Sequence, residues 1–313
     1  MSTLSGPENP RCEGQNKSTI TRMRHATTSI PFISIIACIT MAHTLTGNSS
    51  STSAYLHLVL GGSHWHARNS LKNIIVFGDS YSKYYGSVSW VDHLGKLLQA
   101  PPRKHNFAVP GATADHVLKN QIRGFFRKFS EANDGESDPP LNPDETTYFV
   151  YLGINDCGGR GDNVLNAITT KLFDTLRDLY VKAKARNFVL IDVPPFERTP
   201  QIIKLRWVDR VNRNVTVWNE HLRNKATAFQ SDMDDTTLLL FSSHAFFTDL
   251  LDAPSKYGFS KEDTEMPEGA VWFDELHPTS RIHELLAKQI YASIFEYQGE
   301  VDPSAGHKME RVS

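Results

Sequence analysis

Short apolar segments recur along the chain from about Leu71 onward, and each is continuous rather than alternating with polar residues. Strands that are buried on both faces of a parallel sheet have this pattern. The segments expected to be strands are Asn73–Phe77, Asn106–Val109, Thr147–Leu152, Asn187–Val193 and Thr237–Phe241. The apolar pattern therefore predicts a central parallel sheet of about five strands.

The longer segments between these strands carry apolar residues at helical spacing. In Asn163–Lys184 the apolar side chains fall largely on one stripe, and Arg206–Gln230 and Thr279–Phe295 show the same spacing. Strands that alternate with helices predict an α/β protein, here a three-layer α/β/α sandwich with helices on both faces of the sheet. Breaks rich in polar residues, glycine and proline at Asp134–Pro143 and Ala253–Gly269 are expected to be surface loops within one domain.

The N-terminal part of the chain differs from the rest because it is rich in Ser, Thr and Asn. Its one apolar island, Ile30–Ala42, follows Arg22, Arg24 and His25, and a basic flank before a short apolar core is the layout of a secretory signal. Met23 would be a natural start for such a peptide. The island is too short to cross a bilayer as a helix, so no stable membrane span is expected.

The expected organisation has three parts. These are a leader over 1–70 with a candidate signal peptide, a single domain over 71–300, and a flexible tail over 301–313. With a cleaved signal the protein is secreted, and Asn48 and Asn214 then lie in glycosylation sequons. If the leader is instead a disordered, unprocessed segment, the protein is cytoplasmic.

Composition excludes several classes of partner and site. The chain of 313 residues has a formal net charge of −2 and no long basic run, which argues against a nucleic-acid partner. Its three cysteines show no CxxC spacing, so neither a zinc site nor a disulfide framework is indicated, and Cys157 is expected to be a packed thiol. His64 and His66 have no acidic or cysteine partner at ligand spacing, so we expect them to be solvated and predict no metal.

Candidate chemistry lies where the expected strands end, because sites in parallel α/β sheets form at the carboxyl ends of the strands. Polar and glycine-rich segments follow the first three strands and precede the last helix: Gly78–Ser80, Pro110–Thr113, Gly153–Asp156 and Asp274–Pro278. Each segment alone could be an ordinary turn or a helix cap. Their joint occurrence at strand ends favours a common site.

Together these segments supply the parts of a nucleophilic acyl-transfer site. Ser80 offers a hydroxyl, which needs a base within hydrogen-bonding reach, and His277 is the candidate base. Asp274 lies three residues earlier and can orient the imidazole through its other ring nitrogen. Oxyanion donors would be the N–H groups of Ser80 and Gly111 and the side-chain amide of Asn155.

The segments FGDSYS, NFAVPGATAD, YLGIND and DELHP resemble the four conserved blocks of the SGNH (GDSL-type) serine hydrolases, over Asn73 to about Phe295. The resemblance implies a flavodoxin-like α/β/α sandwich and ester hydrolysis, with the roles just given for the site residues. Tyr81 after the serine, with Trp65 and Trp90 nearby, is most similar to the fungal acetylesterases of carbohydrate esterase family sixteen. GDSY in place of the more usual GDSL leaves the subfamily and the substrate open.

Aromatic residues near the motifs are candidates for contact with a sugar ring, or alternatively for core packing. The three chosen as substrate-binding candidates are Tyr81, Trp90 and Trp272. On the last helix, His283 is expected to face the surface.

We expect a serine esterase that removes acetyl or another short acyl group from a carbohydrate and needs no cofactor, with a monomer as the default state. The alternatives are a lipase or lysophospholipase acting on long acyl chains, and a non-enzymatic flavodoxin-like binding module. The binding module is the weaker alternative, because the sequence has no glycine-rich phosphate loop.

Overall fold

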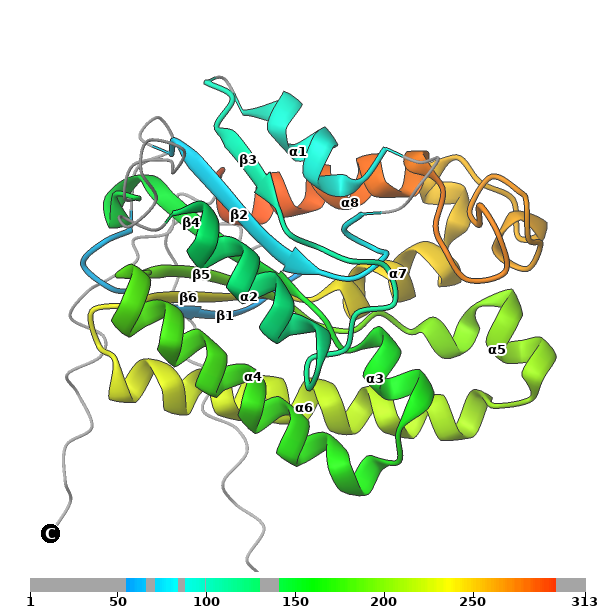
Figure 1. Ribbon diagram of the computed structural model, residues 1–313. Coiled ribbons are helices and arrows are strands. Elements are labelled where there is room, and N and C mark those ends of the chain that lie inside the picture. The colour runs from blue at the N-terminus through cyan, green and yellow to red at the C-terminus, as the bar shows by residue number, and fades with distance from the viewer. Residues whose placement is uncertain (1–54, 66–70, 84–87, 99, 130–140, 297–313) are drawn as a thin grey trace, which may run out of the picture. The chain divides into compact units, whose positions relative to one another are not determined.

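A computed structural model describes residues 55–65, 71–83, 88–98, 100–129 and 141–296, which all belong to one compact unit (Figure 1). Several predictions concern residues outside these ranges: the candidate signal peptide, Met23, the Asn48 sequon, His66 and the tail 301–313. They stay predictions.

The described residues form one sheet of six strands in the order β1-β6-β5-β4-β2-β3. The strands are β1 (Leu56–Leu60), β2 (Asn73–Gly78), β3 (Arg103–Asn106), β4 (Thr146–Tyr151), β5 (Asn187–Ile191) and β6 (Thr237–Phe241). Neighbouring strands from β2 to β6 pair in parallel, while β1 pairs antiparallel with β6. The parallel α/β sheet is confirmed, and the antiparallel edge strand is an addition to it.

The two edge strands are the ones that differ from the prediction. Strand β1 lies inside the segment 1–70 that was assigned to the leader, so the sheet begins before residue 71. Among the described strands it pairs with β6 alone, and it is partly exposed, so it lacks the fully apolar character of the inner strands. At the other edge, β3 is the polar segment RKHN and ends at Asn106, where the prediction had begun. Edge strands need not be apolar on both faces.

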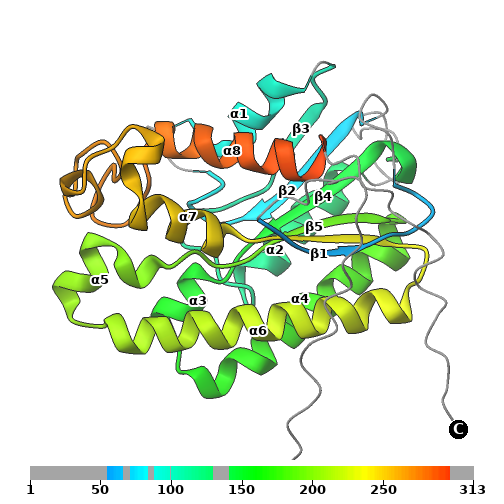
Figure 2. The ribbon, with the colours of Figure 1, turned by 180° about the vertical axis from the view of Figure 1, so that it is seen from behind.

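Helices cover both faces of the sheet, as expected for an α/β/α sandwich (Figures 1 and 2). Within the described residues the α-helices are α1 (Trp90–Leu97), α2 (Val117–Lys128), α3 (Ile154–Gly159), α4 (Asp162–Ala183), α5 (Pro200–Leu205), α6 (Val208–Asp232), α7 (Ser243–Asp252) and α8 (Ser280–Ile294). Short 3₁₀ turns are Pro143–Glu145, Phe196–Arg198, Pro254–Tyr257 and Glu262–Thr264. Helices α1 and α8 pack together on one face, and α2, α4 and α6 lie on the other.

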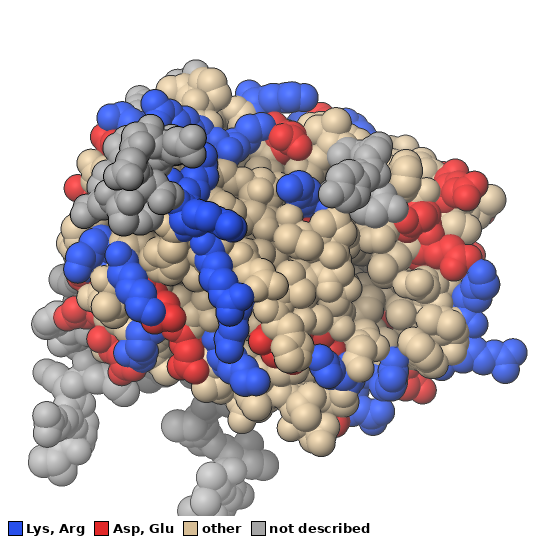
Figure 3. Space-filling model, in the orientation of Figure 1, with Lys and Arg blue, Asp and Glu red and all other residues tan. Residues whose placement is uncertain are grey.

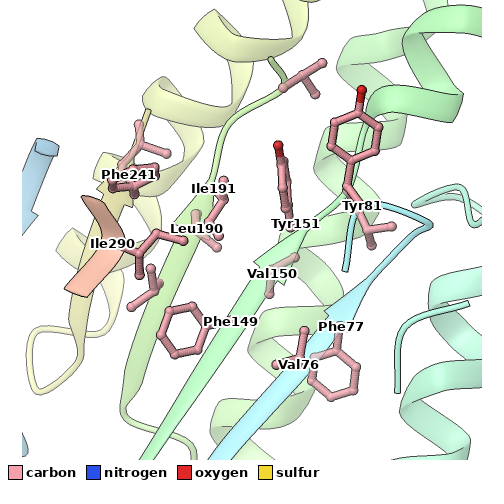
Figure 4. Packing of buried hydrophobic residues seen from close by; sticks show 14 of the residues in the cluster. Val76, Phe77, Tyr81, Phe149, Val150, Tyr151, Leu190, Ile191, Phe241 and Ile290 are labelled. Carbon is pink, nitrogen blue, oxygen red and sulfur yellow. The ribbon is translucent and has the colours of Figure 1, made fainter. Parts of the chain in front are cut away.

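The core lies between the inner strands and these helices. Figure 4 shows side chains of β2, β4, β5 and β6 packed side by side, with Ile290 of α8 lying against the sheet. Phe149 and Leu190 have no exposed surface. Burial of so many large apolar side chains, each worth about 1.5–3 kcal/mol, fixes the strands that carry the site.

Two predictions on individual residues can be tested against the core. Cys157 is fully buried, as expected for a packed thiol, and burial raises the pKa of that thiol. The predicted glycan site at Asn214 is wrong, because this asparagine is buried on α6. Its amide donates to the carbonyl oxygens of Cys157 at 2.8 Å and Arg160 at 2.9 Å. Among the described helices, none has the length and apolar character needed to cross a membrane.

Charged side chains of both signs lie on the face drawn in Figure 3. Basic side chains gather over α2, which carries Lys119, Arg123, Arg127 and Lys128 and no acidic residue. Acidic side chains gather over the loops that follow α7. No single sign covers this face, in keeping with the near-zero net charge of the chain.

Candidate active site

The four candidate segments lie beyond the carboxyl ends of the parallel strands. Gly78 ends β2 and is followed at once by Asp79 and Ser80, while Gly153 follows β4 and precedes α3. Gly153 has a φ of +125°, and a Cβ there would lie 2.4 Å from the Trp218 ring. Only glycine therefore fits the turn that leads from β4 to Asn155.

A tight turn presents the Ser80 side chain. The carbonyl oxygen of Asp79 accepts the N–H groups of Ser82 and Lys83, both at 3.1 Å. The carboxylate of Asp79 accepts the N–H of Tyr81 at 2.9 Å, which closes the turn from its other side. Ser80 is 7% exposed, so the rigid turn places its hydroxyl at the surface of the core rather than in bulk water.

Helix α2 anchors the strand that precedes this turn. The side chain of Gln121 accepts the N–H of Gly78 at 3.0 Å and donates to its carbonyl oxygen at 2.8 Å. This reciprocal pair continues the β-ladder pattern onto a side chain, which fixes the last residue of β2. The sequence pattern had not assigned any role to Gln121.

The structure brings Ser80, His277 and Asp274 together. His277 Nε2 lies 3.0 Å from Ser80 Oγ, and His277 Nδ1 lies 2.8 Å from Asp274 Oδ2. The second carboxylate oxygen, Asp274 Oδ1, accepts the N–H groups of Leu276 and His277, both at 2.7 Å. The carboxylate therefore fixes both the loop and the ring. With Nδ1 facing a carboxylate, Nε2 is left to accept a proton from the serine.

The three predicted anion-binding positions are also linked across loops. Gly111 has a φ of +76° and is exposed, with open space where a Cβ would lie, so its peptide is accessible. Asn155 Nδ2 donates to the carbonyl oxygen of Ala112 at 3.0 Å and lies 3.5 Å from Asp79 Oδ2. The Asn155 amide thus joins the segment after β4 to the segments that carry Gly111 and Ser80.

Two buried acids flank these positions in the sequence. Asp79, next to Ser80, and Asp156, next to Asn155, have no exposed surface. Burial raises the pKa of Asp79 to about 7, with a further contribution from the charge of Asp156. Burial also raises the pKa of Asp156 to about 6, although its carboxylate accepts the N–H of Ala114. The only signal for these acids in the sequence was their position beside motif residues.

The predicted substrate contacts of Tyr81, Trp90 and Trp272 are wrong, because all three side chains are 1% exposed or less. Their polar atoms instead bind neighbouring loops: Tyr81 Oη donates to the carbonyl oxygen of Leu276 at 2.9 Å. Trp90 Nε1 donates to Ser82 Oγ at 3.2 Å, and Trp272 Nε1 donates to the carbonyl oxygen of Thr264 at 2.8 Å. The alternative of core packing holds for each of them.

Two histidines also differ from expectation. His283 was expected at the surface but is buried on α8 beside Tyr81, with ring centroids 6.4 Å apart, and burial lowers its pKa to about 3. His64 has an acidic partner after all, since its Nδ1 lies 2.7 Å from Asp144 Oδ1. Among the residues the structure describes, no cluster of three or more His, Cys, Asp or Glu side chains could hold a metal ion.

Comparison with known proteins identifies the family of the chain. Residues 74–290 match the GDSL-like Lipase/Acylhydrolase family. An acetylesterase from Thermothelomyces thermophilus is 27% identical over 268 residues, which cover 71% of this chain and 87% of that protein. The thermolabile hemolysin of Vibrio parahaemolyticus serotype O3:K6 is 23% identical over 239 residues, or 65% of this chain and 54% of that protein.

A solved structure, a gut microbial diltiazem-metabolizing enzyme, superimposes with a TM-score of 0.51 at 15% identity. The match covers 71% of this chain and 46% of that one, and at this identity it supports the fold alone. The family match, by contrast, spans most of the chain and includes every residue of the candidate site. The chain therefore belongs to the GDSL-like lipase/acylhydrolase family and is a carboxylic ester hydrolase.

Proposed function

We propose that this hydrolase is a serine esterase in which Ser80, His277 and Asp274 form a catalytic triad. The observation that carries the proposal is the position of the His277 ring. One nitrogen lies 3.0 Å from the Ser80 hydroxyl and the other 2.8 Å from the Asp274 carboxylate. A hydroxyl is a weak nucleophile until such a base can take its proton in the transition state.

Acylation begins with attack of Ser80 Oγ on the ester carbonyl carbon while His277 Nε2 takes the hydroxyl proton. Asp274 stabilises the imidazolium that forms, without itself being protonated. The oxyanion of the tetrahedral intermediate accepts hydrogen bonds from the N–H groups of Ser80 and Gly111 and from the Asn155 amide. One such donor contributes about 3–4 kcal/mol to the stability of a transition state.

The intermediate then collapses. The C–O bond to the alcohol breaks, His277 gives its proton to the leaving oxygen, and an acyl-enzyme remains on Ser80. Water attacks this ester while His277 again acts as base, and the second collapse releases the carboxylic acid and restores the serine. The cycle consumes one ester and one water, and its proton transfers run through His277.

For the substrate, we propose an acetyl or other short acyl ester of a carbohydrate. Support comes from the acetylesterase of Thermothelomyces thermophilus, which matches 87% of its length to this chain. Two exposed apolar residues close to site residues in the sequence are candidates for contact with a sugar: Phe273, next to Asp274, is 42% exposed, and Val109, two residues before Gly111, is 43% exposed. These two residues replace the buried aromatics as candidates for substrate contact.

The test of the proposed triad is Ser80→Ala with p-nitrophenyl acetate as substrate. Hydrolysis should fall on the order of 10³-fold or more, while thermal unfolding stays close to that of the wild type. Ser242→Ala is a matched control, because Ser242 is also buried and bonded to an acid, Asp192, at 2.7 Å. That control should keep its activity. A folded Ser80→Ala protein with wild-type turnover would rule out the triad.

A further inference from the structure

Asp79 is a buried acid that immediately precedes Ser80 in the sequence, and the proposed mechanism gives it no role. Its side chain has no exposed surface, although burying a carboxyl group is costly unless its oxygens are hydrogen-bonded. A negative charge at this position would also oppose the oxyanion that forms beside it. A group that is costly to fold and unfavourable for the chemistry needs a compensating contact.

The contacts of Asp79 divide between its two oxygens. Oδ1 accepts the N–H of Tyr81 at 2.9 Å and so completes the turn that presents Ser80. Oδ2 faces the side chain of Asn155, with 3.5 Å between Oδ2 and Nδ2. One carboxyl group thus contacts both the turn of the nucleophile and the amide that would bind the oxyanion.

The Asn155 amide has two hydrogens to place. The short bond from Nδ2 to the carbonyl oxygen of Ala112, at 3.0 Å, occupies one of them. The other lies toward Asp79 at a distance that is the upper limit of a hydrogen bond. A contact of this length orients the amide plane but holds the second hydrogen only weakly, so that hydrogen can be given to a developing oxyanion nearby.

The segment that carries Gly111 is held in a similar way by Asp156, the residue after Asn155. Both of its carboxylate oxygens accept the N–H of Ala114, at 3.2 and 3.1 Å. Each of the two buried acids therefore fixes a loop that carries a proposed oxyanion donor. The pKa of Asp79, raised to about 7 by burial, means that this carboxyl is partly neutral near pH 7, which weakens its repulsion of the oxyanion.

We propose that Asp79 is a positioning residue that acts through Asn155: its Oδ2 sets the plane of the amide and holds the second N–H only weakly, so that the oxyanion can share this hydrogen. The inference rests on the proposed function, because the oxyanion arises in that mechanism. Asp79 does not touch the substrate in this proposal, and its effect should appear in kcat rather than in KM.

Asp79→Asn is the conservative test. The new amide oxygen can still accept the Tyr81 N–H, but its NH₂ group then faces the NH₂ group of Asn155, and two donors cannot bond. With p-nitrophenyl acetate we expect kcat to fall about tenfold and KM to change less than about twofold. Unchanged kcat in a folded Asp79→Asn protein would overturn the proposal.

A double-mutant cycle distinguishes positioning of Asn155 from support of the Ser80 turn. Asn155→Ala alone should lower kcat by about 10²–10³-fold, as for loss of one oxyanion donor. Adding Asp79→Asn to that variant should then lower kcat by less than about twofold, because residues that act through one contact are not additive. A further tenfold loss in the double variant would show that Asp79 acts on Ser80 instead.

Asp192→Asn is the matched control for a buried carboxyl group. Asp192 is likewise buried after its strand, β5, and accepts hydrogen bonds from Ser242 Oγ at 2.7 Å and from the His244 N–H at 2.8 Å. It contacts neither Ser80 nor Asn155 in any hydrogen bond of the described residues. Its conversion to Asn should lower the melting temperature but leave kcat within about twofold in both backgrounds.

A second variant keeps the test open if Asp79→Asn does not fold. Asp79→Ser retains a hydroxyl that can accept the Tyr81 N–H in a turn but is too short to reach Asn155. It should show the same loss of kcat and the same lack of additivity with Asn155→Ala. If the proposed function is wrong, wild type and Ser80→Ala will hydrolyse the ester equally well. If only this inference is wrong, Ser80→Ala will still be much less active than wild type.

Discussion

The hydroxyl of Tyr81 joins the two halves of the site, and Tyr81→Phe removes that link alone. Tyr81 follows the nucleophile, and its Oη donates to the carbonyl oxygen of Leu276, one residue before His277, at 2.9 Å. The ring also lies among aromatic neighbours, with Tyr151 at 6.0 Å between centroids. Phenylalanine would keep this packing and leave no cavity, so the change isolates one hydrogen bond.

The expected cost follows from what the variant leaves behind. A typical hydrogen bond contributes about 0.5–1.5 kcal/mol, and a carbonyl left without a partner in a buried setting costs about 1–3 kcal/mol. We therefore expect Tyr81→Phe to lower the free energy of unfolding by about 1–2 kcal/mol. In a domain of this size 1 kcal/mol shifts the melting temperature by about 2–4 °C, so the shift should be about 2–8 °C.

Activity should fall as well, because Leu276 leads directly into the histidine. A small displacement of His277 relative to Ser80 lengthens the 3.0 Å contact on which proton transfer depends. Misplacement by about 1 Å can cost two orders of magnitude, so a partial shift should lower kcat about tenfold with little change in KM.

Calorimetry and steady-state kinetics on p-nitrophenyl acetate check both effects. Tyr257→Phe is the control, since Tyr257 also donates its hydroxyl to a residue of another element, Asp249 of α7, and both lie outside the four candidate segments. It should lose stability and keep kcat. A Tyr81→Phe variant with unchanged melting temperature and a raised KM would refute this reasoning and return Tyr81 to the substrate-binding role.

Two further predictions test the substrate and the buried histidine. For p-nitrophenyl esters, kcat/KM should fall from acetyl to butyryl to octanoyl. Each methylene group that the site cannot accommodate should cost on the order of 1 kcal/mol of transition-state stabilisation. A rise toward octanoyl, without acetate release from acetylated sugars, would favour the lipase alternative. The folded-state pKa of His283, about 3, is below its unfolded value, mainly through burial and also through repulsion by His93 and His277. Its contribution to stability is therefore complete above about pH 6.5 and lost as pH falls toward 3. Measured by denaturant unfolding, the free energy of unfolding of His283→Gln should fall less than that of the wild type between pH 6.5 and 4. An equal fall in both proteins would contradict the assignment.

The inner part of the fold followed from the apolar pattern, and the edges did not. Strands β2, β4, β5 and β6 are buried on both faces, so each leaves a continuous apolar segment in the sequence. Strand β1 has a partner on one side, and its Leu56 is buried while His57 is exposed. Such a segment has no pattern that separates it from an apolar stretch in a leader, and only pairing with β6 identifies it.

In the site, too, the motifs predicted some features, while others depend on how the side chains pack in the fold. Motifs and strand ends named Ser80, Asp274 and His277, and their side chains meet within hydrogen-bonding distance. The direction of an aromatic side chain has no such signal. Trp90 begins a helix whose apolar face is buried, so the periodicity that predicts a helix also turns this ring inward. Burial, rather than proximity in sequence, decided that Trp90 could not meet a substrate.

Tyr81 stands where the usual GDSL motif has leucine, and it makes a hydrogen bond that leucine cannot make. Leucine after the nucleophile could fill the apolar space among the aromatic neighbours of Tyr81, but it could not donate to the carbonyl oxygen of Leu276. In this chain the tyrosine therefore adds a direct hydrogen bond between the serine turn and the histidine loop, 195 residues apart in sequence. Because the tyrosine is buried, we expect this difference from the usual motif to affect how the proposed triad is held rather than which substrate is bound.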